Sequence, residues 1–158
     1  MPELKVFDKS MQQDIEHFYE KCFTDLGWGY DPAGRHSDIP KTYEVYMENG
    51  CMWCLYDGDL LIGTIAVRNI STESKSDKIA ELKRMYVLKE YQGKGYGHLL
   101  LKTVIAYSYE KGYDKIRLDS QVENHAAVHL FRKYGFVEIP SYNDDAFAEL
   151  YMELELHR

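Results

Sequence analysis

The sequence predicts an α/β fold of the α+β type, in which a mixed, mostly antiparallel sheet of six to seven strands carries helices on both faces. Three apolar runs follow one another between residues 51 and 88 with only turn-forming or polar residues between them, as in hairpins. Two later helical patterns each lie between strands, and a strand–helix–strand order makes the flanking strands parallel. The length of 158 residues favours a single domain that spans residues 1–158.

The first quarter of the chain reads as strand, helix, irregular segment and short helix. Leu4–Phe7 alternates as a strand does, and Ser10 with Gln13 has the spacing of a helix capping box. The helix that follows ends before Gly27, and Lys41–Glu48 predicts a second, short helix. One face of the first helix carries the apolar residues Ile15, Phe18, Cys22 and Phe23.

The middle of the chain predicts three consecutive strands. Cys51–Tyr56 and Leu60–Ile70 flank Asp57-Gly58-Asp59, which is a strong hairpin signal. Ser71–Lys78 is polar and predicts a hairpin loop, and Ala80–Leu88 predicts the next strand.

The strand at 80–88 contains a break in its alternation. Leu82 and Met85 do not share the parity that one face of a regular strand requires. A β-bulge near Arg84 would return both residues to the core face, and we therefore predict one there.

The second half predicts two helices between strands. The apolar face of a helix at His98–Lys111 consists of Leu100, Leu101, Val104 and Ser108, and Gly112 suits its C-terminal turn. Asn124 is expected to cap a shorter helix, whose apolar positions are Ala127, Val128, Phe131 and Tyr134. The remaining predicted strands are Ile116–Ser120, Phe136–Ile139 and Leu150–Leu156.

Composition narrows the class of protein. A formal net charge of −7 disfavours partners such as nucleic acid or an anionic membrane, and no apolar run reaches the ~20 residues that span a bilayer. Three cysteines and no signal peptide indicate a cytoplasmic protein. Cys51 and Cys54 have C-x-x-C spacing, but residues i and i+3 of a strand face opposite ways, which disfavours a disulfide or a shared metal.

A glycine-rich turn links the strand at 80–88 to the long helix. Its sequence is Gln92-Gly93-Lys94-Gly95-Tyr96-Gly97. Such a turn at a helix start can bind phosphate through backbone N–H groups, although tight chain geometry is an equally ordinary reason for glycine. The dinucleotide fingerprint would need glycine at His98, and no P-loop, H-E-x-x-H or paired-cysteine zinc pattern occurs.

The same turn resembles the Q/R-x-x-G-x-G/A signature of the GNAT superfamily of N-acetyltransferases. The strand residues 81–87 before it are similar to those of the family, and Asn124, Ala127, Phe131 and the pair Gly135-Phe136 match its N-x-x-A-x-x-x-Y-x-x-x-G-F segment. The resemblance covers residues 51–139 well and implies a single GNAT-like domain.

The resemblance implies acetyl-CoA as the co-substrate, with no metal. It places the CoA pyrophosphate on the turn at 92–97 and on His98, and the pantetheine arm along the bulged strand. Asn124 would contact the pantetheine or simply cap its helix. The cofactor-binding residues expected on this basis are Met85, Tyr86, Val87, Gln92, Gly93, Lys94, Gly95, Tyr96, Gly97, His98, Asn124 and Phe131.

The resemblance also implies catalytic roles. Glu81 stands where many relatives have a general base, and its alternative is a solvated carboxylate or a partner of Lys83 or Arg84. Phe131 stands where many relatives have a tyrosine acid, so Tyr134 or water would have to protonate the leaving thiolate. Tyr134 otherwise packs, and His125 and His129 are nearby titratable groups.

The irregular segment at 26–40 is either a wall of the acceptor site or a loop that its aromatic residues pin to the core. As substrate-binding candidates it offers Tyr30, Asp31, His36 and Asp38. The expected function is acetyl transfer from acetyl-CoA to a small amine or an amino-acid-like molecule, and the net charge of −7 mildly favours a cationic acceptor. A homodimer is one possible assembly. The alternatives are a CoA-binding sensor without catalysis, which Phe131 keeps open, and a peptide or protein N-acetyltransferase.

Overall fold

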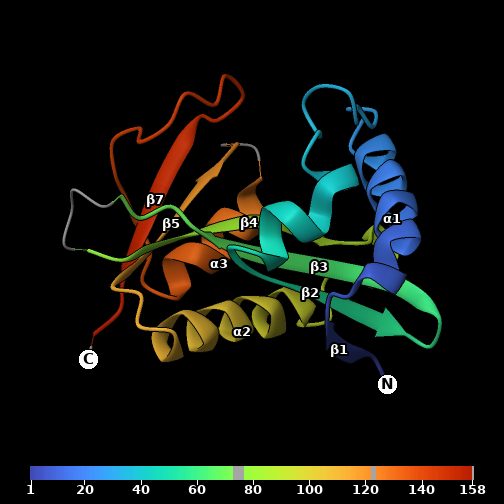
Figure 1. The fold of residues 1–158 in the computed structure, drawn as a ribbon, viewed down its shortest axis with the longest axis horizontal. Coiled ribbons are helices and arrows are strands. Elements are labelled where there is room, and N and C mark those ends of the chain that lie inside the picture. Colours follow the sequence, from blue (N-terminus) through green and yellow to red (C-terminus); the bar gives the residue numbers. More distant parts are fainter. Residues whose placement is uncertain (73–76, 122–123, 158) are drawn as a thin grey trace.

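The computed structural model describes residues 1–72, 77–121 and 124–157 and confirms the predicted fold class (Figure 1). One seven-stranded sheet has the order β1-β2-β3-β4-β5-β7-β6. The pair β4–β5 is parallel, and the other neighbouring pairs in this sheet are antiparallel. The strands are Glu3–Val6 (β1), Gly50–Asp57 (β2), Leu60–Asn69 (β3), Ile79–Val87 (β4), Lys115–Ser120 (β5), Val137–Glu138 (β6) and Leu150–Glu155 (β7). Residues 73–76 of the predicted loop at 71–78 lie outside the described residues.

Helices cover both faces of the sheet, as predicted (Figure 1). The hydroxyl groups of Tyr19 in the first long helix and Thr64 in β3 lie 2.7 Å apart, whereas a Cβ added at the adjacent Gly63 would lie 3.6 Å from Leu100 of the second. Successive strand residues point to opposite faces, so these two helices pack on opposite sides. The α-helices are Gln12–Asp25 (α1), Tyr96–Glu110 (α2) and His125–Lys133 (α3), and the shorter helical turns are Lys9–Met11 (η1), Ile39–Lys41 (η2), Tyr43–Met47 (η3) and Lys89–Tyr91 (η4).

The helix faces agree with the predicted apolar patterns. The buried residues of α2 are the four predicted ones, Leu100, Leu101, Val104 and Ser108. Helix α1 buries its predicted residues and also Tyr19. Helix α2 begins at Tyr96, two residues before the predicted start. Gly95 (φ +89°) is the last residue of the glycine turn with a left-handed backbone, so helical geometry can begin at the next residue.

Three local predictions are wrong in detail. Ser10 does not cap α1: it lies within η1, where the carboxylate of Asp8 accepts its backbone N–H at 2.8 Å and so forms the cap two residues earlier. The predicted short helix at 41–48 is a 3₁₀ turn followed by a π-helix. The predicted strand at 136–139 pairs over only two residues, Val137 and Glu138.

The predicted bulge in β4 is confirmed at Arg84. The β3–β4 register shifts between Thr64 and Ala66, and Arg84 has φ +54°, the only positive φ of a non-glycine residue in the described part of the chain. The hydroxyl of Thr64 donates to the carbonyl of Arg84 at 2.8 Å. Because that hydroxyl proton is used, Tyr19 must be the donor in the 2.7 Å bond between its hydroxyl and Thr64. A buried chain of two hydrogen bonds thus satisfies the carbonyl that the bulge displaces.

Strands β4 and β5 pair only at one end. Ile79–Glu81 pairs with Lys115–Arg117. Beyond these residues β4 continues to Val87 and β5 to Ser120, but the two strands no longer pair with each other. Strand β5 meanwhile pairs with β7 along its whole length. Figure 1 shows β5 and β7 rising away from β4, so the sheet opens into a gap between the two strands.

The three cysteines are buried and free, as expected from their positions. Burial raises the pKa of the Cys22 thiol to about 12. In the described part of the chain, no helix combines the length and apolar character needed to cross a membrane.

We predict that Thr64→Val lowers the free energy of unfolding by about 1–3 kcal/mol, because it leaves the buried Arg84 carbonyl and Tyr19 hydroxyl without their partner. Tyr19→Phe is the control, since it keeps the bond to the bulge and is expected to cost less. Urea denaturation checks both variants. Equal losses in the two variants would contradict the role of Thr64 in holding the bulge.

Candidate functional site

The glycine turn uses its glycines for two different reasons. Gly93 (φ +78°) and Gly95 (φ +89°) have left-handed backbones, and a Cβ at either would meet no atom within 4 Å. Gly97 instead lies where α2 packs on α3, and its Cβ would lie 3.3 Å from the side chain of Leu130. Residues 92–95 are exposed, so the turn is open to a ligand.

The start of α2 has the electrostatics of an anion site. Gly95 is its N-cap residue without a side-chain cap, and the first turn contains no acidic residue. The first intrahelical bond runs from Leu99 N–H to the Gly95 carbonyl, so the backbone N–H groups just before Leu99 have no partner within the helix. Together with the helix dipole, these N–H groups favour a phosphate.

The free edge of β4 faces the gap. Leu88 N–H donates to the Ile62 carbonyl of β3 at 2.9 Å, so Val87 presents its N–H and carbonyl to the opposite side. The Gln92 side chain donates to that Val87 carbonyl at 2.9 Å, which ties the turn to the strand end. By the same alternation, the backbone N–H and carbonyl of Met85 also point into the gap. The side chain of Tyr86 packs against α1, on the face of the sheet that α1 covers.

The predicted residues of α3 have distinct surroundings. Asn124 is exposed at the N-cap position, but its side chain makes no capping hydrogen bond, so the capping alternative is not observed. Phe131 is 4% exposed and packs against Phe136, with ring centroids 5.6 Å apart. The Tyr134 hydroxyl lies 3.2 Å from Nδ1 of His98 and so links α3 to the first turn of α2.

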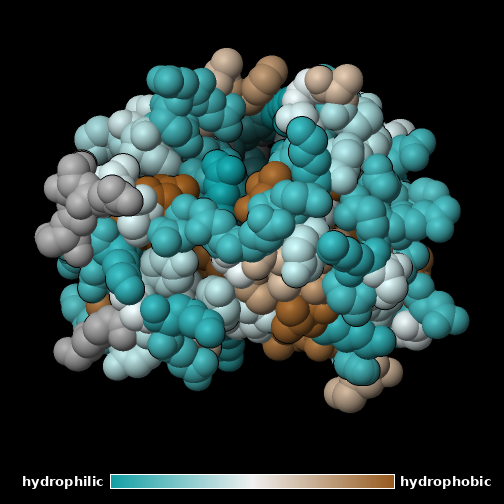
Figure 2. All heavy atoms as spheres, viewed as in Figure 1, coloured by the Kyte–Doolittle hydropathy of each residue, from teal (hydrophilic) through white to brown (hydrophobic). Residues whose placement is uncertain are grey.

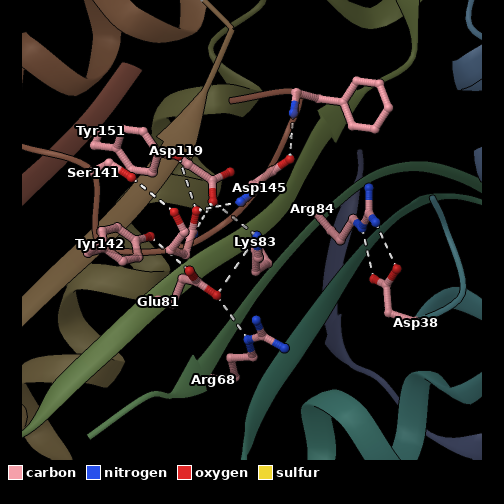
Figure 3. A network of polar contacts seen from close by, with 12 residues as sticks. Asp38, Arg68, Glu81, Lys83, Arg84, Asp119, Ser141, Tyr142, Asp145 and Tyr151 are labelled. Carbon is pink, nitrogen blue, oxygen red and sulfur yellow. Dashed lines mark hydrogen bonds and ion pairs between the residues drawn. The ribbon is translucent and has the colours of Figure 1, made fainter. Parts of the chain in front are cut away.

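Glu81 is a buried carboxylate with three partners (Figure 3). It is 2% exposed and is the last residue of β4 that pairs with β5, so it lies at the closed end of the gap. Arg68 Nε donates to its Oε1 at 2.9 Å, the Tyr142 hydroxyl donates to its Oε2 at 2.8 Å, and Lys83 Nζ lies 3.8 Å from Oε1. The solvated alternative for Glu81 is therefore not observed, and of its two suggested partners it has Lys83.

The network continues away from Glu81 into the segment between β6 and β7 (Figure 3). Lys83 Nζ lies 3.4 Å from Asp119, which also accepts from the Asn143 side chain at 2.7 Å. The Tyr151 hydroxyl donates to Asn143 at 3.2 Å. Burial, and then the charge of Glu81, raises the pKa of Tyr142, which keeps this phenol protonated.

Sequence reasoning missed five members of this network, which are Arg68, Asp119, Tyr142, Asn143 and Tyr151. They come from β3, β5, the 140–149 segment and β7, and the sheet order places β3 and β5 on either side of β4, with β7 next to β5. No local motif marks any of them. The one available signal was that β4, whose other positions are apolar, contains the charged residues Glu81, Lys83 and Arg84 close together.

Arg84, the second suggested partner of Glu81, instead binds Asp38. Its Nε and Nη2 donate to the two carboxylate oxygens at 2.9 and 2.7 Å, and the Tyr46 hydroxyl donates to the same carboxylate. Burial opposes the charge on Asp38, but the bonds and charge of Arg84 outweigh it and hold the pKa of that carboxyl below its usual range. Asp38 therefore fastens the 26–40 segment to the bulge.

His36 is a second internal anchor. It is 2% exposed, stacks on Phe23 with ring centroids 4.0 Å apart, and accepts the Asp31 backbone N–H at Nδ1 (2.9 Å). Burial, and then the charges of Arg84 and Arg35, lowers the pKa of His36. The alternative of a pinned loop thus has direct support for His36 and Asp38.

Tyr30 and Asp31 have more capacity for a ligand. The Tyr30 ring lies in the same stack, 6.3 Å from Phe23, and its hydroxyl is buried without a hydrogen-bond partner. Burial raises the pKa of this phenol to about 12. Asp31 is exposed and accepts the Arg35 N–H at 3.1 Å.

Two segments far apart in the sequence border one side of the sheet. Figure 2 shows a hollow between the 26–48 segment and the 140–149 segment, which Figure 1 draws in blue to cyan and in red. The two segments meet at Arg35, whose guanidinium lies 4.8 Å from the Trp28 ring centroid and 4.0 Å from that of Phe147. In the described part of the chain, no group of three or more His, Cys, Asp or Glu side chains could hold a metal ion.

Comparison with known proteins agrees with this geometry. The pattern of the acetyltransferase (GNAT) family matches residues 12–136. N-acetyltransferase 8B of Homo sapiens is 28% identical over 100 residues, which are 63% of this chain and 44% of that protein. A GNAT-family acetyltransferase of Staphylococcus aureus superposes with a TM-score of 0.86 at 19% identity, over 99% of this chain and 100% of the other. A GNAT-family acetyltransferase of Brucella melitensis, solved in complex with acetyl-CoA, has a TM-score of 0.72 at 15% identity, over 100% of this chain and 90% of the other.

The fold is that of acyl-CoA-dependent N-acyltransferases, and the chain belongs to the GNAT acetyltransferase family. It spans less than half the length of the human relative, so that protein's activity as a whole is not carried over.

We predict that Asp38→Asn lowers the free energy of unfolding by about 2 kcal/mol or more, because it leaves the mostly buried Arg84 without its carboxylate. The exposed Asp31→Asn should change it by no more than about 0.5 kcal/mol. Urea denaturation followed by tryptophan fluorescence measures both. If both variants keep wild-type stability, Asp38 is not an anchor and returns to the substrate-binding candidates.

Proposed function

We propose that the protein transfers an acetyl group from acetyl-CoA to the amine of a small, amino-acid-like molecule by direct attack. The observation that carries this proposal is the gap between β4 and β5, which has a phosphate-type glycine turn at its open end and a buried carboxylate, Glu81, at its closed end. An elongated ligand with a phosphate at one end and a reactive group at the other suits this arrangement.

The turn and the β4 edge would hold acetyl-CoA. The pyrophosphate is assigned to the backbone N–H groups of the turn and of the first turn of α2, with Lys94 and His98 beside it. The amides of the pantetheine arm would continue the sheet along Met85 and Val87, in place of the missing β5 neighbour. Asn124, whose side chain is not used as a cap, is available on the α3 side of the gap.

In this proposal Glu81 is the general base. The acceptor ammonium gives one proton to Glu81, directly or through water, and its freed lone pair attacks the thioester carbon. The backbone N–H of Val87, which faces the gap, would stabilise the oxygen on which negative charge develops. The C–S bond then breaks with its electron pair on sulfur, the amine nitrogen releases its second proton, the thiolate takes up one proton, and Glu81 returns its own to solvent.

The source of the proton for the thiolate follows from Phe131. A phenyl ring has no proton to give, and Tyr134 is engaged with His98 at the start of α2. That contact does not favour Tyr134 as the acid, so water, which carries the second amine proton to sulfur, is the better proposal.

The acceptor site is assigned to the hollow between the 26–48 and 140–149 segments. The unpartnered Tyr30 hydroxyl and the exposed Asp31 are its candidate contacts, whereas His36 and Asp38 would shape it as anchors. The ion pairs around Glu81 and the bulge contain three cations, Arg68, Lys83 and Arg84, and three anions, Asp38, Glu81 and Asp119. This balance suits an acceptor with both an amine and an acid group better than a purely cationic one.

A CoA-binding sensor is the second candidate, because Phe131 removes the usual acid. A thermal-shift assay with acetyl-CoA, followed by thiol release across a panel of amino acids, polyamines and short peptides, distinguishes the possibilities. Stabilisation with turnover on amino acids supports the proposal. Stabilisation without turnover on any amine selects the sensor, turnover on peptides alone selects a peptide acetyltransferase, and no stabilisation contradicts all three.

We predict that Glu81→Gln lowers kcat at neutral pH by about 100-fold and leaves acetyl-CoA binding unchanged, because the amide cannot accept the amine proton. Steady-state kinetics and the thermal shift measure the two quantities. Glu153→Gln is the matched control, since Glu153 is also paired to an arginine on this sheet but lies on β7. Wild-type kcat in Glu81→Gln would remove Glu81 as the base.

A further inference from the structure

We propose that Tyr142 is a positioning residue that determines which oxygen of Glu81 receives the acceptor's proton. The inference rests on the proposed function, because it assumes that Glu81 is the base. Nothing in the sequence pattern suggested Tyr142, which lies in the connection between β6 and β7.

The two oxygens of Glu81 have partners of different chemistry (Figure 3). Oε1 accepts from Arg68 Nε at 2.9 Å and faces Lys83 Nζ at 3.8 Å. Oε2 accepts from the Tyr142 hydroxyl at 2.8 Å. One oxygen therefore faces two cations and the other a neutral phenol.

This difference decides where a proton can go. Guanidinium and ammonium groups only donate hydrogen bonds, so a proton on Oε1 would point at groups that cannot accept it. A phenol hydroxyl donates or accepts, and it can turn from donor to acceptor when Oε2 is protonated. The cations meanwhile keep their bonds to Oε1, which remains an acceptor. Oε2 is thus the oxygen on which a proton finds an acceptor, while Oε1 keeps its bonds to the cations.

The position of Tyr142 does not depend on Glu81 alone. Its ring packs edge-on against Tyr151 with centroids 5.4 Å apart, and the Arg117 guanidinium lies 5.6 Å from its centroid. The adjacent Asn143 donates to Asp119 of β5 at 2.7 Å and fixes the backbone beside it. The charged groups around the pair are therefore Arg68 from β3, Lys83 from β4, and Arg117 and Asp119 from β5.

The consequence is that the 140–149 segment takes part in two tasks. It borders the hollow assigned to the acceptor, and through Tyr142 it sets the orientation of the base.

The test is Tyr142→Phe, which removes the hydroxyl and keeps the ring. We expect kcat to fall about tenfold while the KM for acetyl-CoA is unchanged. Tyr151→Phe is the matched control, because it removes a hydroxyl from the neighbouring ring that bonds Asn143 and not Glu81. Wild-type kcat in Tyr142→Phe, or an equal loss in Tyr151→Phe, would overturn the inference.

A double variant separates positioning from general packing. If Tyr142 acts through Glu81, adding Tyr142→Phe to Glu81→Gln should cause no further loss of kcat. Independent losses that multiply would overturn the inference while leaving Glu81 as the base. If Glu81→Gln alone keeps wild-type kcat, the base assignment fails and the role of Tyr142 falls with it, whereas acetyl-CoA binding would still be measurable by thermal shift.

Discussion

The structure depends on the bulge at Arg84. An arginine with φ +54° is strained by roughly 1 kcal/mol or more, and it persists because its surroundings hold it from two directions. Thr64, backed by Tyr19, bonds the Arg84 carbonyl, while Asp38 binds the Arg84 side chain with both carboxylate oxygens. The bulge bends β4 just beyond its last pairing with β5, and the open edge of β4 results. One strained residue thus links the floor of the sheet, the acceptor-side segment and the gap.

Much of this arrangement could be predicted from the sequence, because it follows from local rules. The parity of Leu82 and Met85 located the bulge, and the glycine spacing located the turn and, to within two residues, the helix start. What could not be predicted is which charges meet. Glu81 has Arg68 and Tyr142 as partners because β3 and the 140–149 segment lie beside it in space, and nothing in their own sequence points to a carboxylate on β4.

The roles of the polar residues in the 26–40 segment could not be decided from the sequence either. His and Asp in an irregular, aromatic segment suit a binding site and a structural anchor equally well, and only their contacts separate the two. His36 is stacked on Phe23 and Asp38 is taken by Arg84, so both stabilise the segment that they were expected to equip for substrate. Tyr30 keeps an unpartnered hydroxyl and so remains a candidate for the original role.

We propose that the pantetheine arm of acetyl-CoA lies in the gap between β4 and β5. A crystal structure of the protein with acetyl-CoA tests it most directly. We expect a pyrophosphate on the backbone N–H groups of the 93–98 turn and a pantetheine arm bonded to the backbone of Met85 and Val87, with the thioester toward Glu81. Acetyl-CoA bound outside the gap, or β4 and β5 paired along their length with no ligand between them, would contradict it.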